Sequence, residues 1–152
     1  MDEIVARSIA KWPNVPAVFG WLSLDRRGQW RIKGERIANP ALRDFIARNY
    51  EADAQGRWFF QNGPQRVYVK LDYTPLVVHF EGEALRDQCG RPFSPDARFL
   101  DEEGSVLLAG QGTVALLDDR DLARVADEAD TLAPIAAAQV SERYGFIQDP
   151  GP

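Results

Sequence analysis

The sequence predicts an α+β protein whose mainly antiparallel sheet is built from three hairpin-like units, with about four short helices. Each unit repeats the spacing Asp-x-x-Gly, at Asp25–Gly28, Asp53–Gly56 and Asp101–Gly104, and strand-like residues follow each Gly. Asp at the first position and Gly at the fourth favour a type I turn. The helical segments between these units do not alternate regularly with single strands, which is typical of the α+β class.

Two helices are predicted in the N-terminal half. The first is "DEIVARSIAKW", which ends before Pro13. The second is "NPALRDFIARNY", where Asn39 suits the N-cap and Pro40 suits the first helical position. Its apolar residues recur at helical spacing and form a stripe of Leu42, Phe45 and Ile46. We expect this helix to cover one face of the sheet.

The longest predicted hairpin is "WFFQNGPQRVYV". Asn62-Gly63 is a strong hairpin signal, but the next residue must supply the N–H that closes such a turn. Pro64 has no N–H. We therefore expect a wider loop from Gln61 to Gln65, whose carboxamides satisfy backbone groups of the loop.

Alternation along the strands of this hairpin predicts which side chains are buried. The expected core face comprises Val67, Val69, Leu71 and Tyr73, and the expected solvent face comprises Arg66, Tyr68, Lys70 and Asp72. The preceding strand carries aromatic residues on both sides, with Trp58 and Phe60 opposite Phe59. A strand of this kind is expected to be covered on both faces.

Two further helices are predicted near the C-terminus. "DDRDLARVADEA" begins with acidic residues, which favour a helix N-terminus. "TLAPIAAAQVSERYG" has Pro134 near its start and Gly145 after its end. The last residues, "QDPGP", are expected to fray.

Length and composition predict one globular domain over residues 1–152, and the Pro- and Gly-containing stretch 86–97 is a candidate joint between two lobes. Hydrophobic residues make up 45% of the chain, which is enough for a core.

The sequence shows neither a signal-peptide pattern nor an apolar run of membrane-spanning length. Cys89 is the one cysteine and can form no internal disulfide, so we expect a soluble protein of the bacterial cytoplasm.

The charge is distributed unevenly along the chain. Residues 24–70 hold ten basic and five acidic residues, whereas residues 71–152 hold six and sixteen. A basic half can attract an anionic partner, and it can equally face the acidic half of the same molecule. Since the net charge is −5, we expect neither nucleic-acid binding nor a membrane partner.

Few residues point to catalysis. His79 is the one histidine, and it shares a strand face with Glu81, so the two could act as a proton relay or simply lie on the sheet surface. Cys89 has no predictable base beside it, and one His with one Cys cannot supply a zinc site. Neither an EF-hand nor a phosphate-binding glycine motif is present. We expect no metal and no cofactor.

Two stretches resemble a known family. "GWLSLDRRGQWRIKGERIANPALRDFIARNY" and "GRWFFQNGPQRVYVKLDYTP" occur in this order within residues 18–78 and resemble a small proteobacterial family known as a domain of unknown function. A second uncharacterised bacterial family is similar in outline. It has G-x-W, then G-x-x-I, a helix, and a hairpin that leads to a Pro-containing strand. The resemblance implies an α+β fold and no particular activity.

The most economical interpretation is a noncatalytic binding or regulatory module that recognises an anionic or peptide-like partner. Its predicted contact residues are Arg66, Gln61, Asn62, Gln65, Tyr68 and Arg31. Arg66 is central because a guanidinium binds carboxylate or phosphate in bidentate fashion, although an ion pair with the acidic half would also explain it. The alternatives are a small enzyme that uses His79 with a nearby carboxylate, and a protein that self-associates through strand edges.

Overall fold

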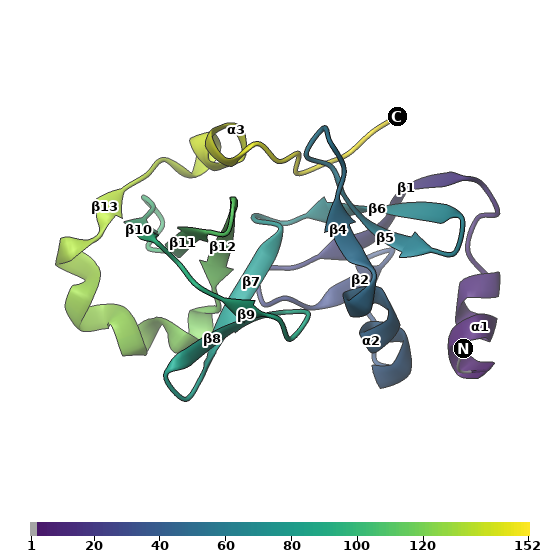
Figure 1. Cartoon of the computed structure of the whole chain (residues 1–152), viewed down its shortest axis with the longest axis horizontal. Coiled ribbons are helices and arrows are strands. Elements are labelled where there is room, and N and C mark those ends of the chain that lie inside the picture. The colour runs from purple at the N-terminus through teal and green to yellow at the C-terminus, as the bar shows by residue number, and fades with distance from the viewer. Residues whose placement is uncertain (1–2) are drawn as a thin grey trace.

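The structure is a computed structural model, and it describes residues 3–152. Two sheets lie side by side, with helices α1 and α2 next to the first sheet and the C-terminal segments around the second (Figure 1). The first part of the chain holds α1 (Glu3–Ala10), β1 (Ala17–Leu24), β2 (Trp30–Ile32), β3 (Glu35–Arg36), α2 (Pro40–Arg48), β4 (Tyr50–Ala52), β5 (Trp58–Asn62) and β6 (Gln65–Leu71). The second holds β7 (Leu76–Glu81), β8 (Ala84–Asp87), β9 (Pro92–Phe93), β10 (Ala97–Leu100), β11 (Val106–Gly110), β12 (Thr113–Leu117), η1 (Asp119–Thr131), β13 (Ala133–Pro134), η2 (Ala137–Gln139) and α3 (Val140–Tyr144).

The two sheets have the same strand order. The first runs β3-β2-β1-β6-β5-β4, and the second runs β9-β8-β7-β12-β11-β10, with β13 added beside β10. In each, the first long strand pairs in parallel with the last strand of a three-stranded meander, as β1 does with β6 and β7 with β12. The α+β prediction is confirmed. The sheets are mixed, although most neighbouring strands are antiparallel.

The three predicted Asp-x-x-Gly turns are confirmed, and a fourth occurs at Asp87–Gly90. In each, the Gly N–H donates to the Asp carbonyl oxygen, at distances of 2.9–3.2 Å. The Asp Oδ1 accepts the N–H groups two and four residues later, as in the pair Arg27 and Gln29 for Asp25. One carboxylate oxygen therefore fixes each turn, and the second oxygen is left for another partner.

The β5–β6 hairpin differs from the expected wide loop. Asn62 pairs directly with Gln65, so the turn has two central residues, Gly63 and Pro64. Gly63 has φ +56°, as the first central position of a type II′ turn requires. This shift by one residue places Pro64 where no closing N–H is needed, because that group now belongs to Gln65.

Helix α2 covers the core face of the first sheet. The side chain of Asn39 accepts a hydrogen bond from Leu42 N and caps the helix, and Pro40 occupies its first turn, as predicted. Phe45 packs edge-on against Phe60 of β5, with ring centroids 5.4 Å apart. Ile46 is fully buried. The predicted stripe therefore faces the sheet, as a helix with this spacing should.

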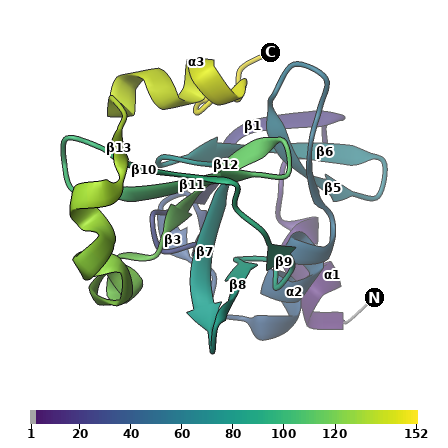
Figure 2. The same cartoon turned by 60° about the vertical axis from the view of Figure 1, so that its left-hand side comes forward.

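The C-terminal helices differ in part from the prediction. Residues 119–131 form a run of 3₁₀ turns rather than an α-helix, with Asp118 as the N-cap and Val125 buried. This segment passes along the outer side of the second sheet (Figure 2). The predicted last helix is shortened to η2 and α3, because Ala133 and Pro134 form β13 beside β10. Gly145 ends α3 in the left-handed conformation, as expected.

The C-terminal tail is bound to the first sheet, so its predicted fraying is wrong. Leu71 N donates to Gln148 O at 2.7 Å, and Arg57 donates to Gly151 O at 3.0 Å.

Tyr68 is only 5% exposed, contrary to its predicted place on a solvent face. Phe19 stacks on its ring and the Arg57 guanidinium lies 4.6 Å above it, which alternation alone cannot reveal.

The chain passes between the sheets at residues 72–75, and several contacts join them. Arg91 donates to the carbonyl oxygens of Ala47 and Tyr50, and the Tyr50 hydroxyl donates to Pro75 O at 2.7 Å. One continuous cluster of buried apolar side chains includes residues of both sheets, such as Val67 of β6 and Val78 of β7. Residues 86–97 belong to the second sheet and its loops. Whether the chain unfolds as one domain stays a prediction.

Among residues 3–152, no helix is both long and apolar enough to cross a membrane.

Candidate functional site

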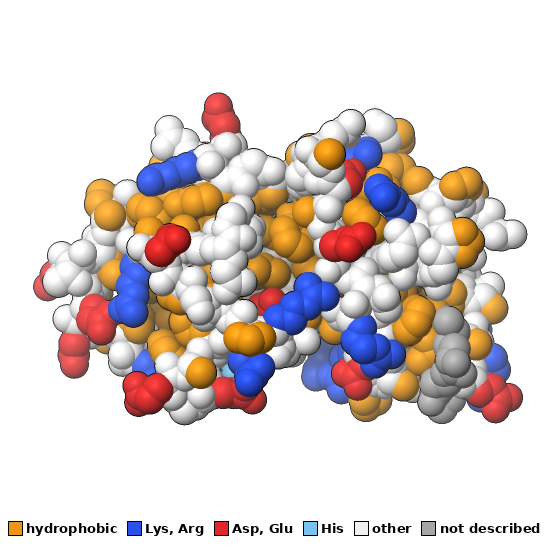
Figure 3. Space-filling view, viewed as in Figure 1, with side chains coloured by type: hydrophobic (Ala, Val, Ile, Leu, Met, Phe, Trp, Pro, Cys, Tyr) orange, Lys and Arg blue, Asp and Glu red, His pale blue; other side chains and the backbone are white. Residues whose placement is uncertain are grey.

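A cleft opens where the two sheets meet. Its larger cavity, of about 400 Å³, lies between the turn at Gly28, helix α2, strand β7 and the turn at Asp87–Gly90. A second cavity, of about 380 Å³, adjoins it and shares Gly28, His79 and Gln88. We call the two together the inter-sheet cleft. Basic side chains gather near the middle of the molecule in the space-filling view (Figure 3).

The close approach of Gly28 to Gln88 shapes the floor of the cleft. A Cβ on Gly28 would lie 2.9 Å from the Gln88 Cβ, and the backbone there has φ +76°. Gln88 is fixed in turn, because its Oε1 accepts from Val77 N and its Nε2 donates to Pro75 O. Glycine at this position therefore lets the first sheet approach the second.

Two guanidiniums in the larger cavity have no partner among the residues that the structure describes. Arg36, at the end of β3, and Arg43, in the first turn of α2, both line it. Neither makes an ion pair or side-chain hydrogen bond with the described residues 3–152. Arg86 also lines the cavity, but it is paired with Glu81 at 2.6 Å. Two arginines are thus free to meet an anion from solution.

The acidic groups of the larger cavity also include both paired and unpaired carboxylates. Glu81 is paired, whereas Asp44 is exposed next to Arg43 and has no basic partner within the described part of the chain. Asp87 is only 4% exposed and lines the cavity from the turn of the second sheet. After the pairing of Arg86 with Glu81, two cations and two carboxylates of the larger cavity have no ion-pair partner among the described residues.

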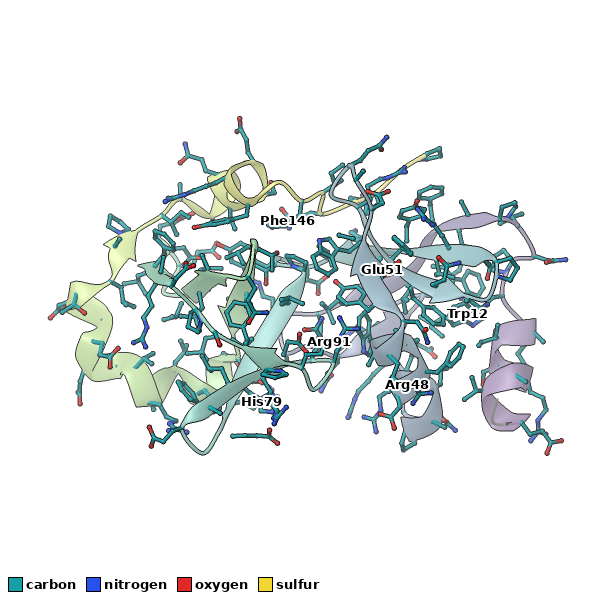
Figure 4. The ribbon with its side chains drawn as sticks, in the orientation of Figure 1. Trp12, Arg48, Glu51, His79, Arg91 and Phe146 are labelled. Carbon is teal, nitrogen blue, oxygen red and sulfur yellow. The ribbon has the colours of Figure 1, made fainter. Side chains whose placement is uncertain are left out.

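His79 lies on β7 and lines both cavities of the cleft. It is half-buried and makes no hydrogen bond or ion pair with any carboxylate of the described residues. Glu81, its predicted partner on the same face, is held by Arg86. The position of His79 relative to the two sheets is shown in Figure 4, where Arg91 lies between them.

The other nucleophile near the cleft is kept protonated. Burial, together with the nearby charge of Asp87, raises the pKa of the Cys89 thiol to about 12, although Arg91 opposes this. A thiol reacts as its thiolate, so Cys89 is a poor nucleophile at neutral pH. The buried hydroxyl of Tyr50 likewise has a raised pKa, chiefly because of burial.

The carboxamides of the β5–β6 hairpin are used in the fold. Gln61 Nε2 donates to the carbonyl oxygens of Gly63 and Gln65, and Asn62 Nδ2 donates to Gln65 Oε1. Gln65 Nε2 donates to the carbonyl oxygens of Pro13 and Val15. Gln61 and Gln65 therefore satisfy backbone carbonyls, and Asn62 bonds to the side chain of Gln65, so all three have a structural role in the hairpin.

The other predicted contact residues are not brought together. Arg31 is paired with Asp25 at 2.9 Å, and the hydroxyl of Tyr68 lies between Asp53 and Arg57. Arg66 is exposed and its guanidinium lies 4.3 Å above the ring of Phe59. No ion pair to Arg66 occurs within residues 3–152, so the alternative explanation, an ion pair with the acidic half, is not supported. Its role in binding stays a prediction.

The sequence interpretation missed Arg36, Arg43 and Asp87. A signal for the last was present, since "DQCGR" repeats the Asp-x-x-Gly spacing of "DAQGR". The two arginines follow no motif, and the fold alone brings β3, α2 and the 87–90 turn to one cavity. Within the described chain, no three His, Cys, Asp or Glu side chains are close enough together to hold a metal ion.

One protein family and two solved structures are similar to this chain. Residues 1–151 match the family described as "Protein of unknown function (DUF2946)". The crystal structure of a DUF1285 family protein from Silicibacter pomeroyi DSS-3 is similar, with a TM-score of 0.56, 17% identity and 84% of each chain covered. A DUF1285 family protein from Shewanella baltica OS155 has a TM-score of 0.48 and 15% identity, over 70% of this chain and 91% of that one. No curated protein matches the sequence.

Proposed function

The chain belongs to this family of proteins of unknown function, and we propose that it is a noncatalytic binding or regulatory module that holds a small anionic ligand in the inter-sheet cleft. One observation carries the proposal: Arg36 and Arg43 line the same cavity and lack an acidic partner among the described residues. Free guanidiniums in a cleft are suited to bind carboxylate or phosphate through paired N–H groups.

The size and place of the cleft support a small ligand. A cavity of about 400 Å³ is within the range of small-molecule sites, roughly 300–1,000 Å³. It lies at the junction of two similar sheets, and ligand sites are common where structural units meet. The groups on its walls come from both sheets, so a bound anion would contact residues on each side.

The chemistry of the cleft favours binding over catalysis. General acid–base work needs a base that is positioned by a third group, and no described side chain holds the ring of His79. Cys89 is protonated at neutral pH because its pKa is raised to about 12. The module therefore binds its ligand without an activated nucleophile.

A second candidate is a small enzyme that uses His79 with a nearby carboxylate. The observation that favours it is the position of His79 in both cavities of the cleft. It requires Glu81 to leave Arg86 and approach the ring when a ligand is bound. In that case His79→Asn would abolish turnover, whereas for a module it would change affinity alone.

The proposal is tested by thermal denaturation and calorimetric titration with a panel of phosphate, monocarboxylates, dicarboxylates and nucleoside monophosphates. At least one anion should raise the Tm of the wild type and bind in a titration. Arg43→Ala should weaken that binding by about tenfold or more, because a charge-assisted hydrogen bond is lost. Arg36→Ala should act in the same direction.

The matched control is Arg48→Ala, on the exposed surface of α2 outside the cavity lining. It removes the same charge from the same helix and should leave the dissociation constant within about twofold. An equal loss in Arg48→Ala and Arg43→Ala would show non-specific attraction. A panel in which no anion binds would contradict the proposed function.

A further inference from the structure

The four Asp-x-x-Gly turns provide an internal comparison. In each, Oδ1 of the Asp accepts two N–H groups of its own turn. In three, Oδ2 has a partner as well: Arg31 binds Asp25, Arg57 binds Asp53, and the Tyr73 hydroxyl donates to Asp101. A second partner is thus the rule for this turn in the protein.

Asp87 is the exception. Its Oδ2 has no hydrogen-bond or ion-pair partner among residues 3–152, although Asp87 is only 4% exposed. Asp87 lines the larger cavity of the inter-sheet cleft, so a group from solution reaches it through that cavity. Oδ2 itself is not fully buried, because among the described residues the buried side-chain polar atom that lacks a partner is Trp21 Nε1. A carboxylate oxygen in so confined a position favours a charged donor that enters the cavity.

The neighbouring arginine explains why Asp87 is left open. Both "DAQGR" and "DQCGR" place an arginine four residues after the Asp. Arg57 turns back and binds its own Asp53 at 2.9 Å. Arg91 instead crosses to the first sheet and donates to Ala47 O and Tyr50 O. The contact that joins the two sheets therefore removes the partner that Asp87 would otherwise have.

We infer that Oδ2 of Asp87 binds the ammonium group of a zwitterionic ligand whose carboxylate or phosphate is held by Arg36 and Arg43. This inference rests on the proposed function and names the class of its ligand. An ammonium is the donor that best matches a buried carboxylate, because it supplies both a positive charge and hydrogen bonds.

The charges of the larger cavity agree with a ligand of this class. Its groups without an ion-pair partner among residues 3–152 are the cations of Arg36 and Arg43 and the carboxylates of Asp44 and Asp87, so they balance. A purely anionic ligand would leave Asp87 desolvated beside it, whereas an amino group removes that penalty. The negative charge of Asp87 also contributes to the raised pKa of Cys89.

The test uses pairs of compounds that differ by one amino group. Glutamate is compared with glutarate, and phosphoethanolamine is compared with ethyl phosphate, by titration calorimetry on the full chain. We expect the amino member of at least one pair to bind wild type about tenfold or more tightly than its amine-free partner. Asp87→Asn should remove this preference and leave the binding of the amine-free member unchanged.

Asn keeps the oxygen that accepts the turn N–H groups, so Asp87→Asn is expected to fold. Asp87→Ser is a second variant that removes the charge while retaining a turn-forming hydroxyl. The matched control is Asp53→Asn, which makes the same change in an equivalent turn outside the cleft lining and should retain the amino preference.

The outcomes separate the two proposals. Binding of no member of any pair, together with failure of the wider anion panel, would contradict the proposed function itself. Equal binding of amino and amine-free members to the wild type would contradict the ammonium inference alone. Water would then be the hydrogen-bond donor to Oδ2 of Asp87. A preference that persists in both Asp87 variants would show that another group holds the ammonium.

Discussion

The guanidinium of Arg91 donates a hydrogen bond to the carbonyl oxygen of Ala47 at 3.1 Å and thereby joins the second sheet to the last turn of helix α2. A second bond reaches Tyr50 O at 3.2 Å. The last carbonyls of a helix have no intrahelical partner, so a cation at this place both satisfies them and complements the helix dipole. This contact ties the walls of the cleft together.

Arg91→Ala is expected to destabilise the protein by about 1–3 kcal/mol, because a charged donor to two carbonyl oxygens is lost. Chemical unfolding should still show one transition, since a single apolar cluster contains residues of both sheets. Arg48→Ala on the exposed side of α2 should change stability by less than about 0.5 kcal/mol. Two separate transitions in the chemical unfolding of the wild type would contradict the prediction that the chain forms a single domain.

Gly28→Ala should lower stability more than Gly34→Ala. Both glycines have positive φ, +76° and +83°, so both substitutions carry the cost of the left-handed conformation, about 1 kcal/mol. Only at Gly28 would the new Cβ also meet another side chain, 2.9 Å from Gln88 Cβ, whereas nothing lies within 4 Å at Gly34. Equal losses in urea unfolding would show that the approach of the two sheets at Gly28 is not close.

Acid should destabilise the protein through Asp118 and Asp53. Burial alone would raise the pKa of Asp118, but hydrogen bonds from the side chain and backbone of Arg120 outweigh it and hold the pKa below its ordinary value. Burial also opposes the lowering at Asp53, where Arg57 and the turn N–H groups prevail. Carboxyls of this kind stabilise the fold above the unfolded pKa of about 3.9 and lose that contribution as the pH falls through the folded pKa.

The measurement is Tm from pH 6 downwards for the wild type and Asp118→Asn. The wild type should lose Tm once the pH falls below about 4. The variant should melt lower than the wild type at pH 6 and show a smaller loss below pH 4, since it lacks one of the titrating groups. An identical pH profile for the two proteins would refute the assignment to Asp118.

Arg66→Ala separates binding from folding at the β5–β6 hairpin. Because Arg66 is exposed and stacks on Phe59, its loss should cost about 0.5–1 kcal/mol. If the hairpin contacts an anionic or peptide-like partner, the variant should also lose the proteins or metabolites that wild type retains in affinity capture from its host. Retention of the same set by Arg66→Ala would restrict this residue to a structural role.

The sequence predicts local structure better than it predicts the cleft. The Asp-x-x-Gly turns, the Asn39 cap and the stripe facing Phe60 depend on residues that are close in the chain, and each was predictable. The two-residue turn at Gly63 and Pro64 was missed because the Asn-Gly signal drew the register one residue too early. The 3₁₀ run at 119–131 was also missed, because its composition favours a helix without deciding its hydrogen-bond pattern.

The cleft could not be predicted, because it depends on how two sheets meet. Arg36 and Arg43 are separated in sequence from Asp87, and no periodicity relates them. Tyr68 alternates as a solvent-facing residue, yet it is buried by Phe19, Arg57 and nearby parts of the fold. Contacts of this range follow from tertiary packing rather than from local pattern.

His79 offers a direct test of the proposed binding site, because it is the one histidine of the chain and it lines both cavities of the cleft. In untagged protein labelled with ¹³C-histidine, its imidazole signals report on the cleft alone. We predict that an anion identified by the titration panel shifts these signals in a saturable way in the wild type, and that Arg43→Ala weakens this response by about tenfold. If the anion binds by calorimetry while the His79 signals stay unchanged up to saturation, the ligand lies elsewhere and the inter-sheet cleft is not the binding site.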